Sequence, residues 1–198
     1  MGIKERRIKE KEDLKNNILV EAKRIAREQG WQQVTIRKIA DAIEYSIPTI
    51  YEYFDSKDDL FNELRLQGYQ LLCEMLEARL AEVISPHDIL LTVAHVYWNF
   101  AWEYRELFEL MHSIDFTQPD DINLLMPYII KIRTIVQQAL SALLNTEISP
   151  TLMRDKLDTT RCIMHGFITI ALGGSIKKER AKKLMLKALD ESISVWLD

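Results

Sequence analysis

Two short helical segments near the N-terminus constrain the fold more than any other feature of the sequence. The first begins after Thr35 and the second after Ser46, and Pro48 stands in the first turn of the second segment, where proline is tolerated. Each segment has about eight residues, and a helix of that length is not stable alone. Both must therefore pack on a third helix, which we expect over residues 8–29. Such a trio presents the second short helix outward, with dimensions that fit the major groove of DNA.

Helical periodicity continues to the C-terminus, and we find no alternating pattern typical of strands. The Ser-Pro pairs at 85–86 and 149–150 are typical helix starts, and Gly173-Gly174 is a typical helix end. A loop is expected at residues 116–121. The other expected helices cover residues 57–84, 87–104, a short stretch ending at 111, a long stretch ending near 144, 150–172 and 177–196. The predicted fold class is all-α, with about nine helices.

The cysteine content and the lack of long apolar stretches indicate a cytoplasmic protein. Cys73 and Cys162 are far apart and neither belongs to a C-x-x-C pair, which is typical of a reducing compartment. The N-terminal segment lacks the apolar core of a secretory signal. No stretch approaches the roughly 20 apolar residues that cross a bilayer. We therefore expect a soluble protein with no membrane partner.

Charge is distributed unevenly along the chain. The formal net charge is −4, but residues 1–57 hold twelve basic and ten acidic side chains, so the remainder carries the negative excess. Residues 4–11 alone hold five basic side chains against Glu5 and Glu10. A basic head on an acidic body suits DNA binding by the N-terminal part. A solvated terminus with no partner has the same composition.

Residues 31–61 resemble the helix-turn-helix of the tetracycline-repressor-like (TetR) family of regulators. The residues that carry the resemblance are Thr35-x-Arg37-x-Ile39-Ala40, Ser46-x-x-Thr49-Ile50-Tyr51-x-Tyr53-Phe54 and Ser56-Lys57-x-x-Leu60. The motif covers about residues 14–61, and chain length and helix count extend the likeness to the whole chain. The resemblance implies a helix-turn-helix DNA-binding domain at residues 1–56 and a ligand-binding and dimerisation domain at residues 57–198.

The resemblance and side-chain chemistry together select the DNA-binding residues. Hydroxyl groups, and a cation beside a helix N-terminus, suit phosphate oxygens. The expected phosphate contacts are Thr35, Thr49, Tyr51 and Lys57, with Ser46 and Tyr53 as further hydroxyl-bearing members of the site. Base contacts are expected from Arg37, Tyr45, Ile47 and Pro48. Arginine pairs with guanine and apolar side chains touch thymine methyl groups. The core that holds these helices is expected to contain Ile39, Ala40, Ile50, Phe54 and Leu60.

One turn residue departs from the family pattern. The family usually has glycine where this chain has Glu44, because the backbone there takes positive φ. A non-glycine residue in that conformation costs on the order of 1 kcal/mol. Glu44 and Glu52 also bring negative charge close to the DNA, so we expect modest affinity with a steep salt dependence, or a turn that is bent differently. The basic segment at residues 4–11 is a candidate to compensate, through phosphates or the adjacent minor groove.

Residues 57–198 contain no recognised catalytic motif, and we expect no enzyme activity and no cofactor. Cys162-x-x-His165, even with His112, is too small a set to predict a metal site. The resemblance implies a small-molecule pocket in this part, and such pockets are mostly apolar with a few polar groups. The residues expected to line it are Trp98, Trp102, His112, Met126 and His165. Ordinary core packing explains any one of them equally well. The expected ligand is apolar or aromatic.

The last two expected helices carry apolar faces, and the resemblance implies a homodimer held by a four-helix bundle of two such pairs. The side chains in question are Met164, Ile168, Ala171, Leu184, Leu186, Leu189, Ile193 and Trp196. The alternative is that they are buried within one subunit. The sequence and the resemblance together predict a homodimeric, sequence-specific DNA-binding regulator that a small ligand releases from a palindromic operator. The resemblance, and not the residues themselves, implies that it acts as a repressor. A DNA-independent helical ligand-binding protein is the main alternative, and a small helical enzyme with His112 or His165 as general base is another.

Overall fold

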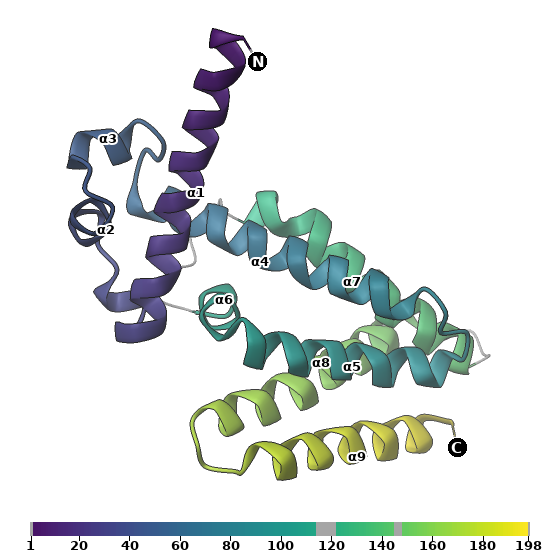
Figure 1. Cartoon of the computed structure of the whole chain (residues 1–198). Coiled ribbons are helices and arrows are strands. Elements are labelled where there is room, and N and C mark those ends of the chain that lie inside the picture. The colour runs from purple at the N-terminus through teal and green to yellow at the C-terminus, as the bar shows by residue number, and fades with distance from the viewer. Residues whose placement is uncertain (1, 114–121, 145–147, 198) are drawn as a thin grey trace. The chain divides into compact units, whose positions relative to one another are not determined.

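The structure is a computed structural model that describes residues 2–113, 122–144 and 148–197, and within these ranges it is all-α (Figure 1). The predicted fold class is thereby confirmed. The helices are α1 (Ile3–Gln29), the short 3-10 helix η1 (Trp31–Gln33), α2 (Ile36–Ala42), α3 (Ile47–Tyr51), α4 (Lys57–Leu80), α5 (Pro86–Glu103), α6 (Arg105–Met111), α7 (Ile122–Leu144), α8 (Pro150–Leu172) and α9 (Lys178–Leu197). The loop expected at residues 116–121 lies outside the described residues. None of the described helices is long and apolar enough to cross a membrane.

The chain divides into two compact units, and α4 contributes to both. The first unit is built from Met1–Gly68 and Arg105–Ile122, and the second from Tyr69–Tyr104 and Asn123–Asp198. Packing units do not show which part of a chain binds DNA or ligand, so the functional boundary between residues 56 and 57 stays a prediction.

Serine and threonine side chains begin five of the helices, as the sequence predicted. In each case the side-chain oxygen accepts a hydrogen bond from the backbone N–H three residues later, at 3.0–3.4 Å. The five capping residues are Thr35, Ser46, Ser56, Ser85 and Ser149. An N-cap of this kind satisfies one of the backbone donors that a helix leaves without a partner at its start. Local chemistry therefore sets these helix boundaries.

The core of the first unit holds α2 and α3 against α1 and the start of α4. All five side chains predicted for this core are buried, with exposed fractions of 0–2 %: Ile39, Ala40, Ile50, Phe54 and Leu60. Ile18 and Ala22 of α1 are also fully buried. The Trp31 ring meets the Phe61 ring edge to face, with 5.1 Å between their centres, which is a favourable aromatic geometry.

Helix α6 belongs to the first unit although it lies some 75 residues further along the chain from η1. The side chain of Glu106 is only 6 % exposed, and its Oε1 lies 2.5 Å from Nη2 of Arg27. The indole N–H of Trp31 donates to the Glu106 carbonyl oxygen at 2.8 Å. On α4, Gly68 leaves room for the Met111 side chain, because a Cβ there would stand 2.6 Å from the Met111 sulfur. The sequence analysis did not predict this packing.

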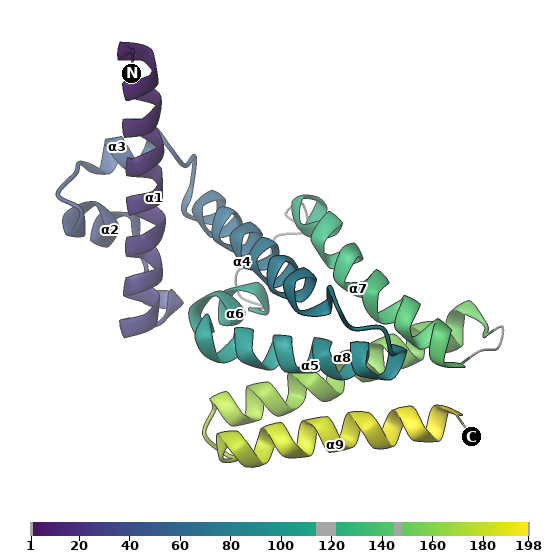
Figure 2. The same cartoon turned by 45° about the vertical axis from the view of Figure 1, so that its right-hand side comes forward.

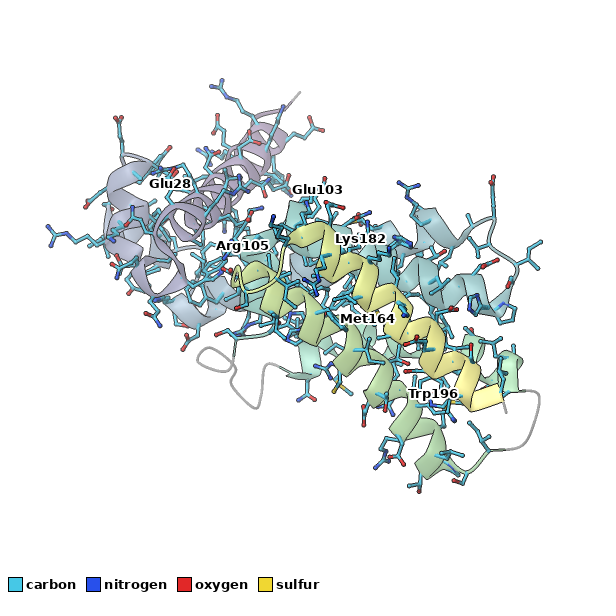
Figure 3. All side chains as sticks on the ribbon, turned by 90° about the horizontal axis from the view of Figure 1, so that it is seen from below. Glu28, Glu103, Arg105, Met164, Lys182 and Trp196 are labelled. Atoms are coloured by element: carbon cyan, nitrogen blue, oxygen red, sulfur yellow. The ribbon has the colours of Figure 1, made fainter. Side chains whose placement is uncertain are left out.

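In the second unit α8 and α9 lie side by side, as Figures 1 and 2 both show. Figure 3 shows their side chains, with Met164 on α8 and Trp196 on α9 labelled. Five of the eight side chains considered for a dimer face are 0–7 % exposed within this single chain: Met164, Ile168, Ala171, Leu189 and Ile193. For these five, burial within one subunit is the correct alternative. Any dimer contact of α8 and α9 has to use other side chains.

Candidate functional site

The short helix α3 is anchored by one apolar side chain and capped by one hydroxyl. Ile50 is fully buried in the first unit. Ser46 Oγ accepts from the Thr49 backbone N–H at 3.3 Å and lies 2.8 Å from Thr49 Oγ1. With one face fixed inward in this way, the other faces of α3 are turned to solvent. This is the arrangement that a recognition helix needs to enter a groove.

Most of the predicted DNA-binding residues are accessible. Seven of the ten are exposed: Thr35, Arg37, Tyr45, Ser46, Ile47, Pro48 and Tyr51. The other three are half-buried: Thr49, Tyr53 and Lys57. Nine of the ten lie on α2, α3 or the segments that flank them, and Lys57 is the first residue of α4. Their contacts with DNA stay a prediction.

Two neighbouring cations of α2 differ in how they are held. The Arg37 side chain is 81 % exposed, and its Nε lies 3.8 Å from a carboxylate oxygen of Asp41, which is also exposed. Such a surface pair is weak, so the Arg37 guanidinium is available to a base or a phosphate. The Lys38 ammonium instead donates to the side-chain oxygens of Gln29 and Gln33, at 2.9 and 3.3 Å. This difference is consistent with the prediction that Arg37 contacts DNA, which stays a prediction.

Just after α3, two lysine ammonium groups lie over the faces of aromatic rings. Lys57 is the first residue of α4, and its Nζ lies 4.9 Å from the centre of the Phe61 ring. Burial lowers the pKa of Lys57 from its usual value. Lys11 of α1 places its Nζ 5.7 Å from the centre of the Tyr53 ring, and burial raises the pKa of that tyrosine. The Tyr53 hydroxyl is therefore protonated at neutral pH and can donate to a phosphate.

The turn between α2 and α3 has the backbone predicted for it. Glu44 takes φ +60°, and among the described residues other than glycine it is the one with positive φ. The Tyr45 backbone N–H donates to the Ala40 carbonyl at 3.0 Å, which closes the end of α2. The turn thus keeps the conformation that favours glycine, with a glutamate in it. The structure therefore does not show a differently bent turn, and the modest DNA affinity with a steep salt dependence stays a prediction.

The rings of two of the predicted ligand-binding residues contact each other in the second unit, with their planes tilted by 39°. Trp98 is 1 % exposed, and the centre of its ring lies 5.9 Å from that of Trp102. The indole N–H of Trp102 is buried and has no hydrogen-bond partner among the described residues. The Lys178 ammonium lies 4.4 Å from the centre of the Trp102 ring. A buried donor without a partner is rare in native proteins, and an acceptor group of a ligand would satisfy it.

The remaining three predicted ligand-binding residues lie in different surroundings. His165 Nδ1 lies 3.3 Å from the Tyr97 hydroxyl oxygen, and burial, with a smaller effect of Arg161, lowers the pKa of His165. Met126 on α7 is 37 % exposed. His112 belongs to the first unit, where Nδ1 lies 2.8 Å from the Phe108 carbonyl oxygen. A pocket common to all five stays a prediction.

A cavity of about 470 Å³ lies between α7 and α8 in the second unit. Its lining consists of Arg133, Gln137, Ser141, Ile148, Pro150, Met153, Arg154 and Leu157. None of the five predicted ligand-binding residues is among them. The lining holds two arginines and no acidic side chain, so its chemistry suits an anionic group. Sequence reasoning missed this cavity because Arg133 and Arg154 stand on separate helices and neither lies in a motif.

Two family models match the sequence. The one described as bacterial regulatory proteins, tetR family, matches residues 18–64, which include α2 and α3. The one described as tetracyclin repressor-like, C-terminal domain, matches residues 90–190. No curated protein matches the sequence.

Solved structures share the fold over almost the whole chain. A TetR family transcriptional regulator from Thermus thermophilus superposes with a TM-score of 0.68 and 19 % identity, covering 89 % of this chain and 92 % of that one. A TetR-family regulator from Bordetella parapertussis gives a TM-score of 0.67 and 22 % identity over 88 % and 95 %. A protein of Saccharomonospora viridis, described as a transcriptional regulator and solved in complex with choline, superposes with a TM-score of 0.71 and 16 % identity. The match covers 92 % of this chain and 96 % of that one. At these identities the likeness shows the fold alone.

Proposed function

This chain belongs to the TetR family of bacterial regulatory proteins, a family of DNA-binding regulators, and from that premise we propose that it is a homodimeric repressor that a small ligand releases from a palindromic operator. The observation that carries the proposal is the outward face of α3. Ile50 anchors this helix, while Ile47 and Tyr51 on α3, and Tyr45 just before it, remain 40–49 % exposed. Large exposed side chains on a short, firmly anchored helix are hard to explain by folding alone and suit base and phosphate contacts.

Selection of bound duplexes from a random pool tests sequence-specific binding directly. We expect a palindrome with guanine opposite Arg37 and thymine methyl groups opposite Ile47. Arg37→Ala should relax the preference at one base pair of each half-site, while Tyr51→Ala and Lys57→Ala should weaken binding to all sequences alike. Unchanged selectivity in Arg37→Ala would show that the base contacts are assigned wrongly. A wild-type protein that is not retained on duplex DNA at low salt would favour the DNA-independent ligand-binding alternative.

The outward face of α8 supports the dimer. Leu152 and Ile170 are 43 % and 46 % exposed, and between them lie Thr159, Cys162 and Gly166 at helical spacing on the same side. A Cβ added at Gly166 would meet nothing within 4 Å. Small residues flanked by exposed apolar ones allow a second helix to approach closely. A C2 dimer built on this face would carry two copies of α3, one for each half-site.

The chain contains its own probe for this dimer. Cys162 is exposed on the proposed face, while Cys73 is buried. A short bis-maleimide should link two wild-type chains through Cys162, and Cys162→Ser should abolish the linked species. Size-exclusion chromatography with light scattering measures the mass of the particle in solution without cross-linking. A monomer at micromolar concentration would contradict the dimer.

The neighbouring rings of Trp98 and Trp102 support a ligand with an apolar or aromatic body. The buried indole N–H of Trp102 adds a donor for an acceptor atom of that ligand. The choline complex of the Saccharomonospora viridis neighbour shows that a protein of this fold holds a small molecule. Binding should change tryptophan fluorescence in the wild type and in Trp31→Phe, and the change should be smaller in Trp102→Phe, in which Trp98 is the remaining tryptophan near the ligand. Because α4 runs through both units, we propose that it transmits binding to the DNA-binding helices, with a coupling of about 1–3 kcal/mol.

A further inference from the structure

We propose that three cations on one side of the N-terminal turns of α1, namely Lys4, Arg7 and Lys11, bind DNA phosphates next to the groove that α3 enters. These three residues are called the basic stripe below. The inference rests on the proposed function, because it adds a second contact to a protein that already binds DNA through α3.

Helix geometry places the three cations on one face. Successive residues of an α-helix are about 100° apart, so spacings of three and four bring side chains to the same side. The same spacing continues through Lys15 into the buried residues Ile18 and Ala22. The basic stripe is therefore the outward continuation of the face by which α1 packs in its own unit.

The acidic side chains of the same segment lie on its other faces. Glu5, Glu10, Glu12 and Asp13 each stand about 90° or more around the helix from the centre of the basic stripe. Glu10 is paired with Arg6, whose Nε lies 2.8 Å away, and Glu5 accepts from the Gly2 backbone N–H at 2.8 Å. The segment has little net charge, yet one of its sides carries cations alone. A random solvated terminus has no reason to be segregated in this way.

Two contacts show which way this side faces. Lys11 Nζ lies 5.7 Å from the centre of the Tyr53 ring, just after α3. Lys15 Nζ lies 5.7 Å from the centre of the Phe54 ring and 2.9 Å from Glu63. Residues 4–13 are exposed, and both Figure 1 and Figure 2 show the N-terminal turns of α1 projecting beyond α3. Lys4 and Arg7 thus extend the side of the unit on which Tyr53 lies.

The helical state of the segment decides between the two DNA targets left open by the sequence. An α-helix with its side chains is about 10–12 Å wide, and the minor groove of B-DNA is about 6 Å wide. The segment cannot enter the minor groove as a helix, so phosphates are the target. From Lys4 to Lys11 the helix rises about 10 Å, and each strand of B-DNA carries one phosphate for about every 3.4 Å of the duplex axis. The basic stripe therefore matches a short run of backbone.

The test compares two double variants of equal charge change in the full-length protein, using the operator selected as described above. Lys4→Gln/Arg7→Gln removes two cations of the basic stripe, and Arg6→Gln/Lys9→Gln removes two cations from the opposite face of the same turns. Affinity is measured by fluorescence anisotropy between 50 and 300 mM KCl. Each lost phosphate contact makes the slope of log K against log salt less negative by about 0.9. We expect a slope change of about 1.5–2 and roughly tenfold weaker binding near 100 mM salt for the basic-stripe variant, with little change for the control.

Each outcome has a distinct meaning. If the two double variants lose affinity equally, general charge and not the basic stripe is responsible, and the inference is wrong. If the basic-stripe variant binds like the wild type while Lys57→Ala binds weakly, the inference fails and the proposed function stands. If the wild type does not bind duplex DNA at all, both fail. Ethylation interference adds a positional check, because the lost phosphates should flank those that Tyr51 and Lys57 protect.

Discussion

The two units differ in how well local sequence spacing predicts which of their side chains are buried and which are exposed. In the first unit the inward side chains of α2 and α3 and the cap of each helix lie where sequence spacing placed them. In the second unit, most of the side chains that the sequence analysis considered for a dimer face are buried against the same chain. Short helices joined by tight turns leave little choice of packing partner. A long amphipathic helix has several possible partners, and only the complete fold selects among them.

The largest expected effect tests the second unit. Gly166→Arg places a long charged side chain on the open face of α8, where it should prevent a second α8 from approaching. Because two half-sites are then no longer bound together, we expect operator affinity to fall by about 100-fold or more. Light scattering should report a monomer, and circular dichroism should report an unchanged helix content.

The control for this variant is Gln138→Arg. It adds the same charge at an exposed position of α7 in the same unit, and it should leave both mass and affinity unchanged. If Gly166→Arg remains a dimer with full affinity, then α8 does not hold the subunits together. In that case the apolar residues of α8 would serve packing within one chain and not contact between two chains.

The next largest effect tests whether the first unit also depends on a contact between residues that are far apart in the sequence. Arg27→Met removes the partner of the Glu106 carboxylate, which is 6 % exposed. A buried charge without its partner is costly, and we expect a loss of about 2 kcal/mol in the free energy of unfolding, because Arg27 itself is largely exposed. Adding Glu106→Gln should restore part of this loss, as urea denaturation of all four members of the cycle would show. If Arg27→Met has wild-type stability, the ion pair of Arg27 and Glu106 does not stabilise the packing of α6 on α1.

Sequence reasoning reached what neighbouring residues determine. The caps, the buried Ile50 and the strained turn at Glu44 all depend on residues within a few positions of each other. The packing of Glu106 on Trp31 and Arg27 was out of reach, because one buried carboxylate among many surface glutamates has no distinguishing pattern. The cavity between Arg133 and Arg154 was missed for the same reason. Which face of α8 is outward depends on α5 and α9, and periodicity alone cannot tell two apolar sides of one helix apart.

A smaller effect tests the strain inside the helix-turn-helix. Glu44→Gly should stabilise the protein by about 1 kcal/mol, because glycine takes φ +60° without a steric penalty. Glu44→Gln keeps the strain and removes the charge, so it should leave stability nearly unchanged but strengthen DNA binding. Urea denaturation and anisotropy separate the two contributions. If Glu44→Gln and Glu44→Gly were equally stable, charge rather than backbone conformation would be the cost at this turn.

The smallest expected effect is a pH dependence that belongs to the second unit. Burial, with Arg161 as a second cause, lowers the pKa of His165 below its ordinary value of 6.5, and burial acts in the same direction on His95. As pH falls through 6.5, the unfolded chain takes up protons that the folded chain does not. The free energy of unfolding therefore decreases below that pH until the folded histidines also protonate. Urea denaturation at pH 7.5 and 5.5 should show a smaller difference for His165→Gln than for the wild type, since glutamine keeps a polar group near Tyr97 without titrating. If the two proteins lose the same free energy of unfolding between these pH values, then His165 does not contribute to the pH dependence. In that case water reaches the pair of Tyr97 and His165 in the folded protein.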